Sequence, residues 1–408
     1  YKNLKNSTII VVSSAIKKNN LELKLAKKNK LPIYKRGDML ANIVSLKKNI
    51  VVTGSHGKTT TTSLISSILH ESKFDATVIN GGVINQFQNS AKLGKSEWSV
   101  LESDESDGSF LKIPTTYSVL TNIDKEHLDF YKSFSNLIKS FEKFLEKTPP
   151  FGKSFICIDE INNQKLIKKI NTKNYQTYGF NKNANFHIIL KKKNNKFSKF
   201  DLKIKLFGKK NRIYKNFQIP LLGEHNIQNA TAAIAITLAL GINITHIKKS
   251  LKNFKGVQRR YIKIFSYNKN DFYDDYAHHP TEINAVLKSV KSVNKNRKII
   301  SIFQPHRYSR LKLLKNEFSK SFKLADEVVL CPVYPAGEKI DPQFNNSTFG
   351  KLIVKNSKVR LIIIDSENDL FNYFRQNLIK DELIICMGAG SISSWIKSIS
   401  QNEYFRKS

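Results

Sequence analysis

The segment GSHGKTT at residues 54–60 limits the fold of this 408-residue chain more than any other stretch. It follows a strand-like run at residues 49–52 and precedes residues 61–69, whose apolar side chains recur at helical spacing. Glycines between a strand and a helix let backbone N–H groups turn toward an anion, and the helix N-terminus adds partial positive charge. Lys58 is placed to reach outer phosphates, and the Thr59 hydroxyl is placed to hold Mg²⁺. The segment predicts a cradle for a nucleoside triphosphate.

The spacing of the glycines differs from that of the common phosphate loop. Gly54 and Gly57 enclose two residues, whereas the common motif has four between its glycines. The segment is therefore either a chance occurrence or a distinct class of loop. A glycine turn with a surface lysine is the ordinary alternative, and the strand and helix on either side favour the phosphate site.

Length and charge limit the number of domains and the class of partner. A chain of 408 residues exceeds one ordinary core, so two or three domains are expected. The formal net charge of +35 is typical of proteins that bind nucleic acid or anionic membranes, but the lysines are spread along the whole chain. A general bias in composition is the simpler explanation, so we expect no nucleic-acid partner and no membrane partner.

The three cysteines are consistent with a cytoplasmic protein. Cys157, Cys331 and Cys386 lie in apolar runs without metal-ligand spacing, and we expect them to be reduced core residues. No apolar run approaches the roughly 18 residues that a membrane span needs. Cytoplasmic location is the expectation.

The first 47 residues predict a partial α/β unit. A buried strand is expected at residues 7–16 and a second strand at residues 31–34. Helices are expected through residues 21–25 and over residues 38–46. These four elements resemble the tail of an α/β unit more than a self-sufficient domain.

Strands and helices alternate after the phosphate loop, which predicts a doubly wound and mostly parallel sheet. The expected strands are residues 76–79, 98–101, 117–120 and 155–158, with a helix over residues 133–147. Ligands of such sheets bind at the carboxyl ends of the strands. The functional residues should therefore follow the strands directly.

Two polar clusters stand at such strand ends. ESDESD occupies residues 102–107, and TNIDKEHLD occupies residues 121–129. The topology places both beside the phosphate loop, where carboxylates and a neutral imidazole suit Mg²⁺. Helix caps or solvated loops are the ordinary alternative for either cluster alone. Two clusters at one sheet edge favour the metal-nucleotide site.

The pattern changes to alternating strands at about residues 185–220, which predicts an antiparallel insertion. GEHNIQN at residues 223–229 then opens a long alanine-rich helix that ends near residue 240. Asn226 carries a donor and an acceptor that suit the edge of a purine, although a helix cap would need the same residue type.

A third α/β module begins near residue 256. Its expected strands are residues 299–303, 327–331, 360–364 and 383–387. Three of these strands run into the segments QPHRYSR, PVYPAGE and GAGS, so chemistry-bearing residues again stand at carboxyl ends.

The segment DDYAHHPTE at residues 274–282 carries an adjacent histidine pair. Neighbouring residues in extended backbone point to opposite faces, so one ion seldom takes both. We expect one of His278 and His279 to contact substrate and the other to be structural. Arg307 and Arg310 suit a site for carboxylate and phosphate better than a solvated surface.

Together, these segments closely resemble the Mur ligases, in order from about residue 7 to residue 390. The motifs that carry the resemblance are GSHGKTT, ESDESD, NID with the following His127, GEHN, DDYAHHPTE and FQPHRY. Ser55 stands where threonine is usual in the family, and Ala277 stands where glycine is usual.

The resemblance implies three domains of α/β class. Residues 1–47 would be the remnant of a domain that binds a UDP-sugar, because the glycine-rich segment that the family uses for UDP is not among these residues. Residues 48–255 would form a P-loop-type central domain that binds ATP on a mostly parallel sheet. Residues 256–408 would form a Rossmann-like domain for the incoming amino acid.

The resemblance also implies roles for single residues. The expected nucleotide-binding residues are Gly54, Ser55, His56, Gly57, Lys58, Thr59 and Thr60, with His225, Asn226 and Asn229 at the adenine. The expected Mg²⁺ ligands are Thr59, Glu102 and His127. The expected catalytic residues are Lys58, His127, His278, Arg307 and Arg310.

The implied reaction joins L-alanine to the lactyl carboxylate of UDP-N-acetylmuramate, with ATP and Mg²⁺ and through an acyl phosphate, in a monomer or weak dimer. Ligases that attach a tripeptide to the same sugar nucleotide carry an aromatic residue at the place of Ser106, and folate-type polyglutamate ligases are more distant. Two alternative interpretations belong to other classes of protein. One is a basic nucleic-acid-binding ATPase that uses Asp104 and Glu105 as its acidic motif, and the other is a catalytically silent scaffold with the same fold.

Overall fold

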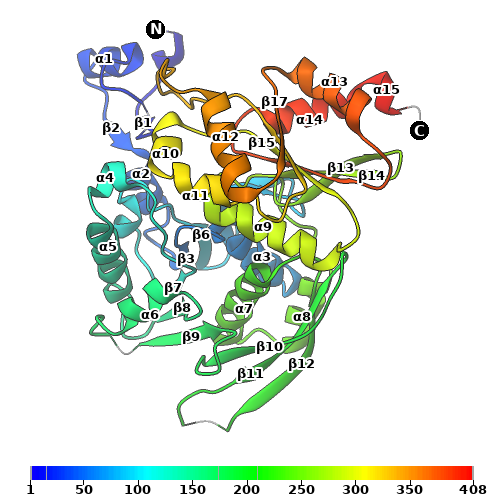
Figure 1. Cartoon of the computed structure of the whole chain (residues 1–408). Coiled ribbons are helices and arrows are strands. Elements are labelled where there is room, and N and C mark those ends of the chain that lie inside the picture. The colour runs from blue at the N-terminus through cyan, green and yellow to red at the C-terminus, as the bar shows by residue number, and fades with distance from the viewer. Residues whose placement is uncertain (1, 15, 173, 209, 407–408) are drawn as a thin grey trace. The chain divides into compact units, whose positions relative to one another are not determined.

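The chain divides into two compact units, each with more contacts inside it than to the other. The computed structural model describes residues 2–14, 16–172, 174–208 and 210–406 (Figure 1). The first unit comprises the chain up to Lys192 with Lys199–Pro220 and Asn226–Lys255. The second comprises Lys193–Ser198, Leu221–His225 and the chain from Gly256.

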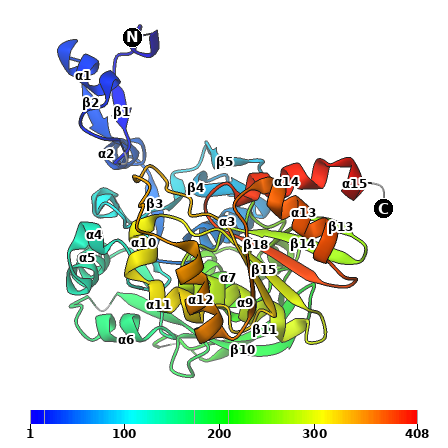
Figure 2. The same cartoon turned by 45° about the horizontal axis from the view of Figure 1, so that its top comes forward.

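The N-terminal segment forms a small sheet of two parallel strands, β1 (Ile10–Val12) and β2 (Ile33–Lys35). They alternate with α1 (Leu21–Lys28) and α2 (Arg36–Ile43), and Figure 2 shows this cluster. The prediction of a long buried strand at residues 7–16 is wrong: β1 has three residues and Val11 is 49% exposed. Two short strands cannot bury both faces of a sheet. Residue 15 lies outside the described residues.

The main sheet of the first unit has ten strands in the order β12-β11-β10-β9-β8-β7-β3-β6-β4-β5. Its centre is β3 (Lys48–Thr53), which pairs in parallel with both β6 and β7. The remaining strands up to β9 are β4 (Thr77–Ile84), β5 (Asn89–Lys92), β6 (Trp98–Glu102), β7 (Tyr117–Leu120), β8 (Lys153–Cys157) and β9 (Tyr175–Gly179). The pair β4–β5 is antiparallel, whereas β6–β4, β7–β8 and β8–β9 are parallel. The predicted doubly wound sheet is confirmed.

The strands predicted as an antiparallel insertion at residues 185–220 are present, and they extend this same sheet. β10 (Phe186–Lys193) pairs in parallel with β9, and β11 (Ser198–Ile204) and β12 (Arg212–Ile219) follow it outward. The chain turns between β10 and β11 where the Asn194 N–H donates to the Phe197 carbonyl at 3.0 Å, and so short a connection requires an antiparallel pair. An alternating pattern identifies half-exposed strands but not the sheet that they join.

The helix after the phosphate loop, α3 (Lys58–Glu71), is buried on every side from Lys58 to Leu69. The other helices of this unit include α4 (Leu128–Tyr131), α5 (Phe134–Glu146), α6 (Ile161–Ile167), α7 (Glu224–Ala239) and α8 (Ile244–Lys252). Phe110 packs against Phe141 and Phe144 of α5 with ring centroids 5.4 and 5.3 Å apart. Apolar packing therefore holds the strands that carry the loop.

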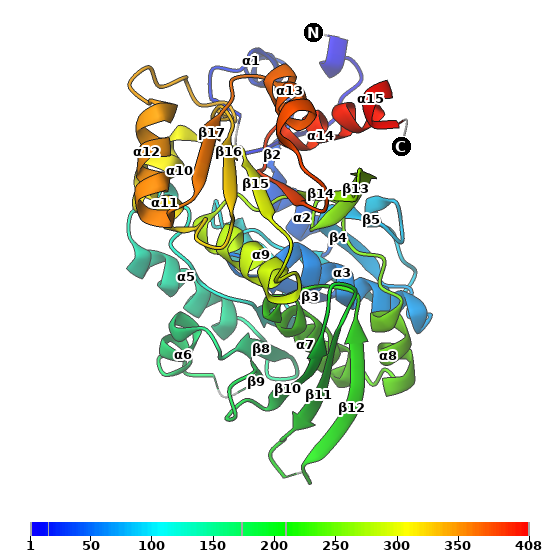
Figure 3. The same ribbon diagram turned by 45° about the vertical axis from the view of Figure 1, so that its right-hand side comes forward.

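The second unit contains a six-stranded sheet in the order β13-β14-β18-β15-β16-β17 (Figure 3). Its strands are β13 (Ile262–Tyr267), β14 (Asn270–Asp275), β15 (Ile299–Phe303), β16 (Glu327–Leu330), β17 (Arg360–Ile363) and β18 (Leu383–Met387). The hairpin β13–β14 is antiparallel and the other pairs are parallel. The four predicted strands and the Rossmann-like class are confirmed, and the hairpin is an addition.

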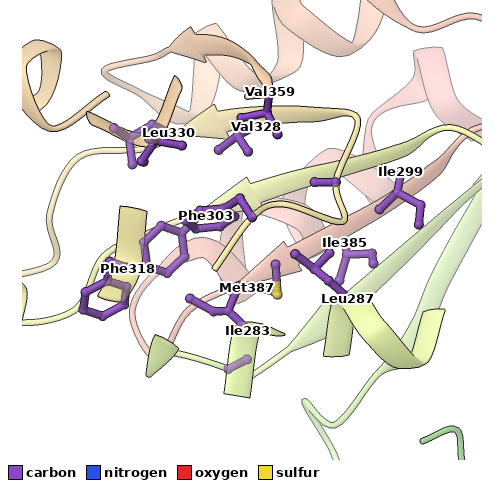
Figure 4. Packing of buried hydrophobic residues seen from close by; sticks show 14 of the residues in the cluster. Ile283, Leu287, Ile299, Phe303, Phe318, Val328, Leu330, Val359, Ile385 and Met387 are labelled. Atoms are coloured by element: carbon purple, nitrogen blue, oxygen red, sulfur yellow. The ribbon is translucent and has the colours of Figure 1, made fainter. Parts of the chain in front are cut away.

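Seven helices are described with this sheet: α9 (Pro280–Val293), α10 (Tyr308–Leu313), α11 (Lys315–Lys320), α12 (Asn346–Ser357), α13 (Glu367–Asn377), α14 (Ile392–Gln401) and α15 (Glu403–Arg406). Ile283 and Leu287 of α9 pack with Phe303 and Met387, which lie at the carboxyl ends of β15 and β18 (Figure 4). The three cysteines are buried free thiols, as predicted. Among the described residues, no helix combines the length and the apolar character that crossing a bilayer requires.

Candidate active site

The phosphate loop leaves the carboxyl end of β3 in a backbone that requires glycine. Gly54 has φ +127° and Gly57, which precedes α3, has φ +83°. A Cβ at Gly54 would lie 2.2 Å from Thr121 Oγ1, and one at Gly57 would lie 2.6 Å from Asn229 Oδ1. The loop is therefore left-handed where it turns and closely enclosed, and it opens the N-terminus of a 14-residue helix.

The segment after β7 holds the loop from one side. The His56 N–H donates to Asn122 Oδ1 at 2.8 Å, and the Asp124 N–H donates to Ser55 Oγ at 2.9 Å. His56 Nε2 lies 3.1 Å from Asp124 Oδ2. The predicted approach of residues 121–129 to the loop is thus present as direct hydrogen bonds.

Lys58 points toward the segment after β6. Its Nζ donates to the carbonyl oxygens of Gly54 and Ser55 at 2.6 and 3.1 Å and to Glu105 Oε2 at 2.8 Å. Asp104 Oδ1 lies 3.6 Å away. Burial alone would lower the pKa of Lys58, but the nearby carboxylates, Glu105 foremost, outweigh burial and raise it above its usual range. The ammonium therefore keeps its positive charge.

The three expected metal ligands fall into two neighbouring contacts. Thr59 Oγ1 donates to Glu102 Oε1 at 3.1 Å, while the Gly81 N–H holds Glu102 Oε2 at 2.8 Å. His127 Nε2 lies 3.8 Å from Glu105 Oε1 instead. Potential ligand atoms of Asp104, Glu105 and His127 lie within 4.8 Å of one another. Hydroxyl and carboxylate oxygens are ligands that suit Mg²⁺, and Glu105 Oε1 is a buried acceptor without a hydrogen-bond partner among the described residues.

The residues expected at the adenine divide between the units. Asn226 and Asn229 lie in the first unit near the start of α7, where Asn229 Nδ2 donates to Asn226 Oδ1 at 3.3 Å. Asn226 is inside the first turn of α7, which begins at Glu224, and is not its cap. His225 belongs to the second unit, where burial and then the Arg260 guanidinium lower its pKa to about 4.

The two adjacent histidines of the second unit have different surroundings. The His279 side chain accepts the Thr281 N–H, and Glu282 completes a capping box at the start of α9. His278 Nδ1 lies 3.0 Å from the Tyr276 carbonyl oxygen, and its ring lies 5.7 Å from that of His306. His279 is the histidine that caps a helix, and His278 faces the strand ends.

The two expected arginines meet different partners after β15. Arg307, at φ +72°, donates from Nε to Glu338 Oε1 at 2.8 Å, and Arg310 Nη1 lies 3.3 Å from His306 Nδ1. His306 stacks on Tyr334 at 5.6 Å. Burial, followed by the nearby His278 and arginine charges, lowers the pKa of His306 to about 3, so its imidazole is neutral.

Sequence reasoning left several contacting residues without a role. Glu105 lies within the quoted ESDESD segment, and Glu338 lies within PVYPAGE, so position after a strand would have indicated both. Arg259 gave no such signal because it precedes the hairpin. Its guanidinium lies 4.8 Å from the Tyr276 ring centroid, and its Nη2 donates to the Gly388 carbonyl at 2.5 Å.

Comparison with known proteins agrees with this arrangement. Residues 52–237 match the Mur ligase middle domain, and residues 259–390 match the Mur ligase, glutamate ligase domain. The UDP-N-acetylmuramate–L-alanine ligase of Pelagibacter ubique is 57% identical over 400 residues, which cover 98% of this chain and 86% of that protein. That of Bartonella bacilliformis is 40% identical over 97% of this chain and 83% of its own length.

Solved structures give the same result. The UDP-N-acetylmuramate–alanine ligase of Thermotoga maritima superposes with a TM-score of 0.81 at 25% identity, over 99% of this chain and 87% of its own. A murein peptide ligase of Psychrobacter arcticus shares the fold, with a TM-score of 0.70 at 20% identity over 98% of this chain and 86% of its own. These relatives are consistent with a chain that uses ATP and acts on small molecules. This chain belongs to the Mur ligase family.

Proposed function

We propose that this chain is an ATP-dependent ligase that joins L-alanine to the lactyl carboxylate of UDP-N-acetylmuramate in peptidoglycan precursor synthesis. The observation that carries the proposal is the 57% identity, over 98% of the chain, to a protein named for that activity. The surroundings of Lys58 supply an independent argument, since a charged ammonium, a glycine loop and a helix N-terminus are the groups that bind the phosphates of ATP. A ligase of this kind acts as a monomer or weak dimer in the cytoplasm.

The first step is transfer of the γ-phosphoryl group from ATP to the lactyl carboxylate, which yields an acyl phosphate and ADP. Lys58 and the N–H groups at the start of α3 neutralise the phosphate oxygens, and Asn226, Asn229 and His225 bind the adenine. Thr59, Glu102 and His127 would hold Mg²⁺, which supplies further charge neutralisation when bound. The protein contributes positioning and charge, not a covalent intermediate.

The second step forms the amide bond. The amine of L-alanine attacks the acyl carbon, and inorganic phosphate leaves from the tetrahedral intermediate. Arg307 and Arg310 provide guanidinium groups for the carboxylate and the acyl phosphate, and His278 provides a polar contact at the same strand ends. In this proposal residues 1–47 belong to the sugar-nucleotide domain, residues 48–255 bind ATP, and residues 256–408 bind the amino acid.

The test is phosphate release by the purified chain with ATP, Mg²⁺ and UDP-N-acetylmuramate. We expect release that depends on L-alanine, together with formation of the alanyl product by mass spectrometry. A tripeptide acceptor is the comparison, because Ser106, whose hydroxyl donates to Asp104 Oδ2 at 2.8 Å, favours the alanine ligase over the tripeptide ligase. Turnover with the tripeptide and none with L-alanine would replace this proposal with the second activity.

A further inference from the structure

The three donors of the Lys58 ammonium are all engaged by the protein. They reach the carbonyl oxygens of Gly54 and Ser55 and the carboxylate of Glu105, at 2.6, 3.1 and 2.8 Å. An ammonium group has three N–H donors and no more. A phosphoryl oxygen that is to be gripped by Lys58 must therefore displace one of these acceptors.

Glu105 is the strongest of the three acceptors and is firmly placed. Burial raises the pKa of the Glu105 carboxyl to about 8, and the Lys58 ammonium opposes that shift. Glu105 is the only one of the three acceptors that can ionise, and a carboxylate accepts a hydrogen bond about twice as strong as a neutral acceptor does. Its side chain is fully buried. The Tyr131 hydroxyl and the Gly108 N–H both donate to its carbonyl oxygen, so its backbone is fixed as well. The protein therefore encloses the carboxyl group on a fixed backbone.

We propose that Glu105 is a positioning residue that holds the phosphate-loop lysine against its own loop and competes with the nucleotide for it. The inference rests on the proposed function only in taking residues 54–60 as the nucleotide site. Above its raised pKa of about 8, Glu105 displaced from Lys58 is a buried carboxylate next to Asp104 and close to the incoming phosphates. The resulting repulsion makes triphosphate binding depend on a divalent cation more strongly than the loop alone would require.

The experiment measures binding of ATP and of adenosine by calorimetry, in Mg²⁺ and in excess EDTA, at a pH above the raised pKa of Glu105 of about 8. Glu105→Gln keeps the shape of the side chain and removes its charge. We expect it to tighten binding of ATP in EDTA by about tenfold, the equivalent of one charge-assisted hydrogen bond. The gain in Mg²⁺ should be smaller, and adenosine, which has no phosphate to offer Lys58, should bind unchanged. A residue that only stabilised the fold would weaken all three.

Two variants accompany it. Asp104→Asn changes a partly exposed carboxylate at 3.6 Å from Nζ and should shift ATP binding in the same direction by about threefold. Glu97→Gln is the matched control, because Glu97 forms an exposed ion pair with Lys48 at 2.9 Å and should change nothing. Thermal melting checks each variant, and if Glu105→Gln does not fold, Asp104→Asn decides.

The outcomes separate this inference from the ligase proposal. Equal or weaker binding of ATP in EDTA by Glu105→Gln overturns the competition, whatever the turnover of the wild-type chain. A wild type that binds ATP without alanine-dependent phosphate release contradicts the ligase proposal and leaves the binding comparison readable. A wild type that does not bind ATP overturns both.

Discussion

The phosphate-loop edge of the ten-stranded sheet and the strand-end edge of the six-stranded sheet occupy equivalent positions in two α/β folds, but they are built from different chemistry. At the first edge, Lys58 and Glu105 form a buried pair in a backbone shaped by glycine. At the second edge, rings and guanidinium groups dominate: Arg259 lies over Tyr276, and His306 stacks on Tyr334.

In the proposed function, the two edges would bind two kinds of ligand. Buried charge acts strongly over short distances because little water screens it, which suits phosphate groups. Guanidinium groups are weakly hydrated and stack on rings, and they present a planar fork to carboxylates and acyl phosphates. The first edge should therefore act through charge, and the second through orientation. The following experiments test that distinction.

The largest effect should come from Lys58→Ala. Removal of the charge from the first edge should lower the rate of phosphate release about 10³-fold, because the phosphate charge then develops without its main cationic partner. Steady-state kinetics at saturating ATP measure the loss. Lys48→Ala is the control, since Lys48 is a half-exposed lysine at the start of β3, at the end of the strand opposite the loop. Near-normal turnover by Lys58→Ala would remove the nucleotide site from residues 54–60.

The second prediction concerns the backbone of the first edge. Gly54→Ala should lower the free energy of unfolding by about 3 kcal/mol, because a Cβ would meet Thr121 Oγ1 at 2.2 Å in a left-handed backbone. Gly208→Ala, at φ +70° but with no described atom beyond its chain neighbours within 4 Å of the added Cβ, should cost only about 1 kcal/mol. Urea denaturation compares the two. Equal losses of unfolding free energy in the two variants would show that the close enclosure of Gly54 adds nothing to the cost of the substitution.

The order of elements at both edges was predictable from the sequence. Residues 49–69 combine an apolar β-branched run, two glycines and a helical period, and these are local signals that directly determine β3, the loop and α3. Polar clusters directly after strands identified residues 102–107 and 121–129, because parallel strands end at one sheet edge. The motif at residues 274–282 likewise marked the second edge.

The pairing of individual side chains was not predictable. Glu102 and Glu105 stand in one acidic segment. Its spacing does not predict that Thr59 donates to Glu102 and that Lys58 donates to Glu105. Such pairing depends on the turn of the chain after β6. The strands β10–β12 were predicted as strands, but the sheet that they join was not, because alternation describes the two faces of a strand and not its neighbour. Non-local packing determines both the pairing of these side chains and the sheet that a strand joins.

The third prediction concerns the pH dependence of the second unit. Burial, opposed by Arg260 and by the Ala277 N–H, raises the pKa of Asp275 to about 7. A carboxyl whose pKa is raised by folding stabilises the fold fully below its ordinary value, and that contribution is lost as the pH rises through about 7. Between about pH 5.5 and about pH 8, folding raises proton binding by Asp275 over roughly 1.5 pH units at about 1.4 kcal/mol each, so Asp275→Asn should gain about 2 kcal/mol relative to wild type. Denaturation at both pH values measures the gain, and parallel wild-type and variant profiles contradict it.

The smallest effect should come from Glu338→Gln, and it tests orientation at the second edge most directly. Glu338 accepts Arg307 Nε at 2.8 Å and the Ser309 N–H at 3.1 Å, so it holds the guanidinium at one angle without removing its charge. We expect KM for L-alanine to rise about fivefold, the equivalent of about 1 kcal/mol, with kcat nearly unchanged.

The matched control for that variant is Asp381→Asn, which loosens an exposed ion pair with Arg297 at 2.9 Å in the same unit and should leave KM unchanged. If Glu338→Gln lowered kcat and left KM alone, the arginine would act on the developing charge, as Lys58 does. The two edges would then work by one principle, and the contrast between buried charge and oriented guanidinium would have to be abandoned.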